Sequence, residues 1–421
     1  MFSASRVVAA QPMMMTDHTL TTSRIYVLAM DDQHLVYYDQ QQRLRKLNLN
    51  KLVQLQSAGY RPLSLPNDIG LIEFADGQRL LGHLKARSNE TKDTIATSFY
   101  WDSMIGVQTT PQNISVFDDR CERKPIVSSR YKRTIPVGLD DVRSIQFQHS
   151  PTPASNAQVT GDTITMQNGE TLTGFILGFD ADNLQLQQDS GQLLNVGLPQ
   201  IASIRLLQDV SLCRADFTVE LIDGSRLHAA KISFNKDTLR MKVSLTGQSE
   251  DELQLPITFL KQLRILKHGY QLMPLRKLPM TITKQSQVFG LQHSPTWTAS
   301  NLKLHAPTNI RFKLPKHAVN FAATVRLDTT NPNEAPQVLK WANMRLTIQP
   351  ELSTNPSILQ IDAANQTHQI QIDLQASTWI ELNLDQAANG PIMDRLRLDD
   401  AHVLIHNAQQ TGGITHSGQS P

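Results

Sequence analysis

The sequence predicts an all-β protein in which tandem small barrels precede a β-sandwich. Helical periodicity is scarce, whereas apolar and polar residues alternate in many short segments such as 216–224 and 368–375. Turn dipeptides recur about every 8–12 residues, a spacing typical of sandwiches and barrels. One motif, a turn followed by a polar step, a leucine and an apolar run, occurs three times in the first two thirds of the chain.

Length and charge limit the classes of protein that need to be considered. The chain has 421 residues, which predicts roughly two to four domains. Forty basic residues against 38 acidic ones leave a formal net charge of +2, so no nucleic-acid partner is expected. No apolar run reaches the roughly 18 residues of a membrane helix, so no membrane span is expected either. Cys121 and Cys213 belong to no metal-binding or redox spacing, and whether they pair is left open.

The amino terminus leaves two alternatives for localisation. The letters VVAAQ, which end at Gln11, resemble the end of a secretory signal, but the apolar stretch that should precede them is missing. Either the protein is cytoplasmic, or the start falls inside a longer signal peptide and the protein is extracytoplasmic or at the cell surface. We favour the second alternative. Residues 1–20 are expected to be a disordered tail or a signal remnant.

The clearest copy of the repeated motif reads NGETLTGFILGF and starts at Asn168. Asn168-Gly169 predicts a hairpin turn, because glycine accepts the positive φ that a tight turn requires. Gly174 and Gly178 predict a bulge or a bend in the returning strand. Two strands follow, then one helical turn after Pro199 and a closing strand. Five short strands with a helical turn before the last are the order of an SH3-like or Sm-like barrel.

The other copies keep the same spacing. Gly169 to Gly224 is 55 positions, and Pro199 to Pro256 is 57. A third copy begins at Asp76, and a fainter one precedes it, so about four tandem barrels are expected. Closure into barrels would also remove the exposed strand edges that so many short strands create. The expected barrels cover residues 21–66, 67–150, 158–210 and 211–270, and the second carries an insertion because residues 89–133 fit no strand pattern.

From about residue 286 the turn dipeptides stop and longer alternating segments appear. Roughly seven or eight strands over about 125 residues are typical of a jelly-roll sandwich. The sandwich is expected to cover residues 286–408. Residues 409–421 are rich in Gly, Gln and Ser and are expected to be disordered.

The segment from 286 resembles the NPCBM module, a carbohydrate-binding module attached to glycosyl hydrolase family 98 enzymes. Leu398 stands where that family usually has Trp, and Arg326 where it usually has Gly. The resemblance implies a galactose-binding-like jelly roll and a glycan partner. The barrels also resemble modules that precede such domains in bacterial exported proteins. The positions that match the family are a His-Ala pair, a Leu-Pro pair, a Phe-x-Ala-x-Val-x-x-Asp strand and closing Asp residues: His305, Ala306, Leu314, Pro315, Phe321, Ala323, Val325, Asp328, Asp394, Asp400 and Ala401.

Sugar binding needs an aromatic face for the C–H side of a pyranose and polar groups for its hydroxyls. Trp297 lies in a loop-like segment and is the best exposed aromatic candidate. Trp379 lies in a strand, where core packing is the alternative. His305 is more simply a hydrogen-bonded residue at a strand start, and His293 is a further polar candidate. The expected ligand-binding residues are Trp297, His305, Trp341, Asn343, Trp379 and Asp394.

Neither catalysis nor a catalytic cofactor is expected. Adjacent acidic pairs such as Asp399-Asp400 point to opposite faces of a strand, and no nucleophile elbow, phosphate-binding loop or metalloprotease motif occurs. A structural calcium is the one metal considered, with Asp328 and Asp394 as ligand candidates. The sequence therefore predicts a non-catalytic protein for glycan or cell-surface recognition. The alternative is a scaffold whose barrels and sandwich bind proteins and whose sugar cleft is inert.

Overall fold

A computed structural model of the chain shows an all-β protein, as predicted. The chain forms two compact units. Unit 1 takes most of the chain up to Ile265, and unit 2 takes Leu266 onward together with Thr16–Thr22 and Asn50–Val53. The structure describes residues 11–59, 68–85, 97–110, 126–147, 161–180, 182–208, 215–235, 237–245, 250–288, 291–298, 301–329, 342–386 and 394–407. Both cysteines, Trp341 and residues 409–421 lie outside these ranges.

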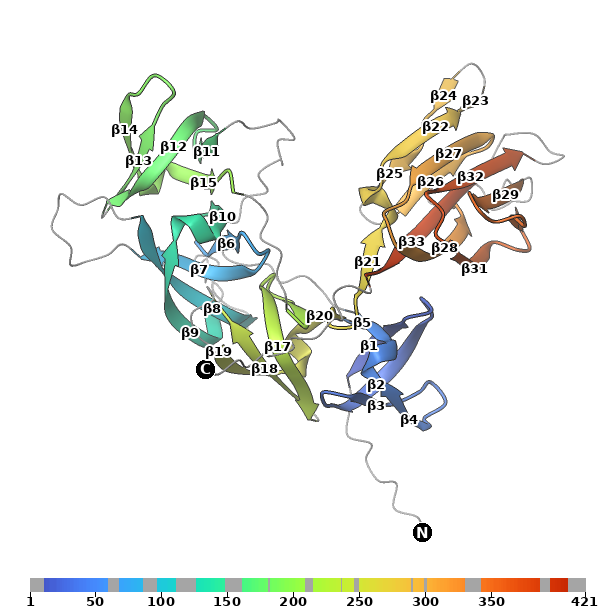
Figure 1. Ribbon diagram of the computed structural model, residues 1–421, viewed down its shortest axis with the longest axis horizontal. Helices are drawn as coiled ribbons and strands as arrows, with labels where there is room; N and C mark the ends of the chain where they lie inside the picture. Colours follow the sequence, from blue (N-terminus) through green and yellow to red (C-terminus); the bar gives the residue numbers. More distant parts are fainter. Residues whose placement is uncertain are drawn as a thin grey trace, which may run out of the picture. The chain divides into compact units, whose positions relative to one another are not determined.

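The first two thirds of the chain repeat one five-strand motif four times, and we name the copies modules 1 to 4 (Figure 1). Module 1 contains β1 (Pro12–Asp17), β2 (Thr22–Met30), β3 (His34–Tyr38), β4 (Leu44–Asn48) and β5 (Leu52–Ser57). Module 2 contains β6 (Gly70–Phe74), β7 (Arg79–Lys85), β8 (Ser98–Thr110), β9 (Ile126–Gly138) and β10 (Val142–Gln146). Module 3 contains β11 (Asp162–Met166), β12 (Thr171–Asp180), β13 (Asn183–Gln187), β14 (Leu193–Gly197) and β15 (Ile201–Arg205). Module 4 contains β16 (Phe217–Leu221), β17 (Arg226–Asn235), β18 (Thr238–Ser244), β19 (Glu250–Pro256) and β20 (Leu260–Ile265).

Strand pairing is the same in every module. The first strand pairs with the second and the fifth, the second with the third, and the third with the fourth. One turn of 3-10 helix precedes the fifth strand, which is the order that the sequence predicted. These turns are η1 (Leu49–Lys51), η2 (Leu139–Asp141), η3 (Leu198–Gln200) and η4 (Ile257–Phe259).

The repeated turn dipeptide has one geometry in three modules. Its glycine has a φ between +87° and +95°, a region that disfavours residues with a Cβ. The side-chain oxygen of the residue before the glycine accepts the backbone N–H two positions further on, at 2.8–3.0 Å. The hairpin turns that the sequence predicted are therefore present. They are Asp76-Gly77, Asn168-Gly169 and Asp223-Gly224.

In modules 1, 3 and 4 the second strand is bent by a bulge. In β12 the register with β13 shifts between Ile176 and Gly178, in the region where glycines predicted a bulge. A Cβ on Gly174 would lie 2.3 Å from the carbonyl oxygen of Gln187, so only glycine allows this close approach. The second strands of modules 1 and 4, β2 and β17, show the same kind of register shift against the third strands. The bulge lets one strand pair on both sides of a small module.

The segment 89–133, which fitted no strand pattern, contributes to the two longest strands of unit 1. β8 and β9 have 13 residues each and pair antiparallel along their length, from Ser98 opposite Gly138 to Thr110 opposite Ile126. Module 2 is therefore extended by a long hairpin beyond the length of the other modules.

The modules of unit 1 join by strand pairing in an order that differs from the chain order. In module 4, β20 pairs with β5 of module 1, and β17 pairs with β2 of module 1 and with β7 of module 2. In module 2, β10 pairs with β15 of module 3. The spatial order is therefore 1–4–2–3. The spacing of the sequence repeats does not specify this order.

Unit 2 contains a β-sandwich of two main sheets (Figure 1). Their inward-facing side chains form one buried core that includes Phe312 and Phe321. Phe321 and Val325, which match the family resemblance, are fully buried, so they support the fold. One sheet contains β21 (Tyr270–Pro274), β25 (Thr296–Trp297), β26 (Asn301–His305), β28 (Ala318–Leu327), β31 (Thr367–Asp373) and β33 (Arg395–His406). The other contains β22 (Met280–Lys284), β27 (Thr308–Lys313), β29 (Asn343–Pro350), β30 (Ser357–Asp362) and β32 (Trp379–Gln386).

Three short elements complete the described fold. β23 (Ser286–Val288) and β24 (Leu291–His293) form a two-stranded sheet, and η5 (Leu275–Lys277) connects β21 to β22. Among the described residues, no helix has the length and apolar character needed to cross a bilayer.

Candidate functional site

Several of the predicted site residues lie at one end of the sandwich. β26 and β28 end at His305 and Leu327, and the antiparallel β33 begins beside them at Arg395. The backbone N–H of Ala306 donates to the carbonyl of Asp394 at 2.8 Å, and that of Asp328 donates to the carbonyl of Arg395 at 2.9 Å. His305, Asp328 and Asp394 are therefore neighbours here.

Asp394 is fully buried at this end. Its Oδ1 accepts the backbone N–H of Asn343 at 3.0 Å, whereas its Oδ2 has no hydrogen-bond partner among the described residues. Burial raises the pKa of the Asp394 carboxyl to about 6, although the bond from Asn343 acts in the opposite direction. Asp394 therefore fixes the start of β29 and does not present its carboxylate to solvent.

His305 is half-buried and held by its neighbours. Its Nδ1 lies 2.9 Å from the carbonyl oxygen of Ala306 and 3.1 Å from the hydroxyl of Ser286, which itself donates to that carbonyl at 2.7 Å. The ring stacks on His293 with centroids 4.7 Å apart. Burial lowers the pKa of His305, and the nearby His293 and Arg395 lower it further, against the hydrogen bond to Ala306. The neutral imidazole is the form that this environment favours.

The metal candidates do not form a cation site in the described residues. Asp328 forms an ion pair with Lys303 at 3.3 Å, and Asp394 binds a backbone N–H. Within the ranges that the structure describes, no group of three or more His, Cys, Asp or Glu side chains is placed to hold a metal. Calcium takes six to eight oxygen ligands, so these residues do not fit a calcium site.

Trp297, the aromatic residue that the sequence favoured, packs against the core of the sandwich. Its ring meets Phe312 edge-to-face, with centroids 6.4 Å apart and an interplanar angle of 73°. The residue is half-buried, and the interaction with Phe312 accounts for its position.

Trp379 lies on the outer face of the five-stranded sheet. Its neighbours in β32, Ile380 and Leu382, are buried, so the alternating residues Trp379 and Glu381 point away from the core. The guanidinium carbon of Arg311, on the adjacent β27, lies 4.1 Å from the centre of the indole ring. The half-buried indole is therefore held by a cation on one side.

Polar side chains beside Trp379 are fixed by hydrogen bonds. The Glu381 carboxylate accepts two bonds from Arg311, at 2.7 and 3.1 Å, and one from the amide of Asn309 at 2.9 Å. Burial would raise the pKa of Glu381, but these bonds and the charge of Arg311 hold it below its ordinary value. We name Asn309, Arg311, Trp379 and Glu381 the Trp379 cluster.

A second carboxylate adjoins the indole. Glu351 accepts bonds from the N–H and hydroxyl of Thr378, at 2.8 and 2.5 Å. These bonds, and a weaker one from the Trp379 side chain, hold the pKa of Glu351 below its ordinary value. The indole thus lies between fixed charged groups on the sheet surface.

The sequence made Trp379 a candidate, with core packing as the alternative, and named none of its partners. Asn309 and Arg311 alternate with buried residues in β27, as Glu381 does in β32. That alternation was visible in the sequence and placed each side chain on the outer face. The pairing of Arg311 opposite Glu381 joins residues 70 positions apart, and no local pattern specifies it.

Comparisons with known proteins give structural likeness only. No family model matches the chain, and no curated protein matches it. The CBM51 module of a family GH95 protein from Clostridium perfringens, solved with methyl-galactose, has 12% identity and a TM-score of 0.24, and the match covers 32% of this chain and 99% of that one. The tandem CBM51 modules of a family GH98 glycoside hydrolase from Streptococcus pneumoniae have 12% identity and a TM-score of 0.21, with 80% and 88% covered.

A further match is to a protease and not to a carbohydrate-binding module. The secreted serine protease VesC from Vibrio cholerae has 10% identity and a TM-score of 0.21, with 97% of this chain and 99% of that chain covered. All of these TM-scores are low, so the fold described above rests on the strands and their pairing.

Proposed function

We propose that the chain is a non-catalytic recognition protein whose sandwich binds a carbohydrate at the Trp379 cluster. The observation that supports this proposal is the half-buried indole of Trp379 beside the hydrogen-bonded side chains of Arg311, Glu381 and Asn309. An indole supplies an apolar surface for sugar C–H groups, and planar amide, carboxylate and guanidinium groups suit paired hydroxyls. Their mutual bonds reduce the side-chain entropy that ligand binding would otherwise remove.

This proposal moves the predicted ligand contacts away from the buried residues. Asp394 carries no exposed surface, and His305 is bonded within the fold, so we assign both to positioning the loops. Trp297 is assigned to the core contact with Phe312. The glycan resemblance is retained, with Trp379 as its aromatic contact. A glycan-recognition role also suits a location outside the cytoplasm, and an in-frame signal peptide upstream of Met1 in genomic DNA would support that location.

A glycan array with the full chain tests the proposal. We expect saturable binding of a neutral glycan, abolished by Trp379→Ala and weakened about ten-fold by Glu381→Gln, which keeps the shape of the side chain. Trp297→Phe is the matched control, because it keeps an aromatic ring against Phe312, and it should bind as the unchanged protein does.

Two outcomes contradict the proposal. Absence of binding across chemically diverse neutral glycans would favour a protein-binding scaffold. If Trp297→Phe abolishes glycan binding and Trp379→Ala leaves it intact, the binding site lies at Trp297 instead.

A further inference from the structure

One row of polar side chains crosses ten strands of unit 1. Each member lies directly opposite the next on a neighbouring antiparallel strand, and the row passes through modules 1, 4, 2 and 3 in that order. At about 4.8 Å between strands, the row is roughly 40 Å long. From β5 to β12 it consists of Gln56, Gln262, Glu220, Arg226, Arg79, Glu73, Ser144, Arg205, Thr163 and Thr173.

The row lies on the solvent side of the sheet. Every member is half-buried or exposed. The residues that alternate with them along the strands point into the module cores, and most of these are buried at 4% exposure or less, among them Leu55, Leu263, Val219, Ile72 and Ile145. The polar face is therefore continuous, although it is assembled from modules that are distant in the sequence.

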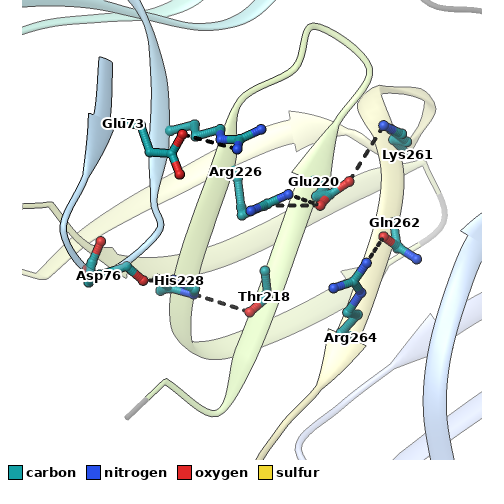
Figure 2. A network of polar contacts seen from close by, with 10 residues as sticks. Glu73, Asp76, Thr218, Glu220, Arg226, His228, Lys261, Gln262 and Arg264 are labelled. Atoms are coloured by element: carbon teal, nitrogen blue, oxygen red, sulfur yellow. Dashed lines mark hydrogen bonds and ion pairs between the residues drawn. The ribbon is translucent and has the colours of Figure 1, made fainter. Parts of the chain in front are cut away.

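Each carboxylate in the row lies between two cations. Glu220 Oε1 accepts two bonds from Arg226, at 2.7 and 3.0 Å, and its Oε2 lies 3.6 Å from the ammonium of Lys261. Figure 2 shows Glu220 between these two side chains. Glu73 lies in the same way between Arg79 at 3.1 Å and another arginine of module 2. Each of the two carboxylates therefore has two cationic partners, which leaves a net positive charge around it.

Two further arginines, Arg205 and Arg264, add positive charge, although Glu220 acts electrostatically on Arg264. In the part of unit 1 that the structure describes, no carboxylate lies within ion-pair distance of Arg205 or Arg264. Arg264 donates to the amide oxygen of Gln262 at 3.0 Å and lies opposite Thr218, next to the row (Figure 2). Beside the two carboxylates of the row lie six cations, Arg79, Arg143, Arg205, Arg226, Lys261 and Arg264, whereas the whole chain has a net charge of only +2. The Asp76 carboxylate adjoins the same network near His228 (Figure 2).

We propose that this row binds an extended acidic polysaccharide. The excess of arginines complements a chain of carboxylates, and guanidinium groups bind carboxylates with paired hydrogen bonds. The amides of Gln56 and Gln262 and the hydroxyls of Ser144 and Thr163 suit the sugar hydroxyls between those charges. A face that repeats at the strand spacing fits a polymer of repeating units better than a single small anion.

The same row suits a nucleic acid less well. None of its ten members is aromatic, so it offers no platform on which bases could stack. Glu73 and Glu220 would also oppose the closely spaced phosphates of a duplex, whereas they can accept bonds from sugar hydroxyls.

Titration of the full chain with polygalacturonate oligomers tests this inference. We expect binding at low salt that weakens as salt is raised, and that falls about ten-fold for each of Arg226→Gln and Arg205→Gln. Arg205 has no ion-pair partner among the described residues, so its substitution should leave the fold unchanged. Glu220→Gln removes a negative charge and should strengthen binding. Arg240→Gln, on the exposed side of β18 and outside the row, is the matched control and should have no effect.

The result that would overturn the inference is no binding of polygalacturonate at low salt, or binding that Arg205→Gln and Arg240→Gln reduce equally. Tighter binding of a 30-base-pair DNA duplex than of polygalacturonate would also overturn it, in favour of a nucleic-acid surface. Methyl-esterified polygalacturonate, which keeps the sugar chain and removes the charge, should not bind the row. Trp379→Ala should leave polygalacturonate binding unchanged, so this inference and the sandwich proposal can fail separately.

Discussion

Asp394 and Asn343 are joined by a hydrogen bond of 3.0 Å from the backbone N–H of Asn343 to Oδ1 of Asp394. The bond ties the first residue of β29 to the residue that precedes β33, at the end of the sandwich. Because the carboxyl is fully buried and its other oxygen has no partner among the described residues, it tolerates a proton better than an exposed carboxyl does.

Sandwich stability should therefore depend on the ionisation of Asp394. The folded-state pKa of about 6 lies above the ordinary value of 3.8, so the folded protein binds the proton more tightly than the unfolded chain. The stabilisation is present below pH 3.8 and is lost as pH rises through 6. Asp394→Asn keeps the acceptor for Asn343 and removes the charge, so its stability relative to the unchanged protein should rise by about 2 kcal/mol between pH 4 and pH 7.

Urea denaturation of both proteins across that range measures the difference. Asp385→Asn changes a half-exposed carboxyl of the same sandwich and serves as the control. A difference between Asp394→Asn and the unchanged protein that stays constant with pH would contradict the role of the buried carboxyl.

Unit 1 should respond to acid in the opposite direction, through His228. Burial is the largest influence on its pKa and lowers it, against the hydrogen bond to the carbonyl of Asp76. A proton is bound more weakly in the folded state, so stability is lost as pH falls below the unfolded value of about 6.5. His228→Gln should reduce this acid sensitivity, which denaturation of unit 1 between pH 5 and 8 would detect. An acid response identical to that of the unchanged protein would count against His228 as its source.

Gln78 should be the residue on which the joint between modules 2 and 4 depends most. It is buried, its amide nitrogen donates to the carbonyl of Ser244 at 3.0 Å, and its amide oxygen accepts the N–H of His228 at 3.1 Å. Gln78→Met fills the same space but removes the hydrogen bonds to the Ser244 carbonyl and to the His228 N–H, which costs about 2–4 kcal/mol.

Hydrogen exchange provides a local measurement for this substitution. The amide of His228 should lose protection, while amides in module 3 keep theirs. Unchanged protection at His228 would show that the joint does not need Gln78.

Two glycines of module 3 should differ in their tolerance of alanine. A Cβ on Gly174 would lie 2.3 Å from a carbonyl oxygen of β13, so Gly174→Ala must displace a strand and should cost about 3 kcal/mol or more. Gly169 has a φ of +87° but open space around it, so Gly169→Ala should cost only about 1 kcal/mol. Chemical denaturation of the two variants measures the contrast, and equal losses would contradict it.

The local features of the fold were predictable from sequence because they depend on near neighbours. The Asp76-Gly77 turn needs only a side-chain acceptor and a residue that tolerates positive φ, and both are visible in a dipeptide. The glycines of β12 predicted a bulge for the same reason. The five-strand order followed from the spacing between such turns.

Features that depend on distant pairing were not predictable. The bridge between Arg79 and Arg226 joins modules 2 and 4, and nothing near either residue specifies the other. The sequence also predicted the wrong environment for two tryptophans, Trp297 and Trp379. Trp297 looked loop-like but packs on Phe312, whereas Trp379 looked like a core strand residue but lies on the outer face beside Arg311.

The spatial order of the modules has a consequence for biosynthesis. Module 4 is the last of the four to emerge from a ribosome, yet it supplies the strand that covers β5 and the residue that bridges to β7. Until Phe217–Leu221 and the strands after it have been translated, the nascent chain carries two unprotected β-edges, which are sites for misassembly with other chains. Module 4 thus covers the strand edges that modules 1 and 2 leave exposed.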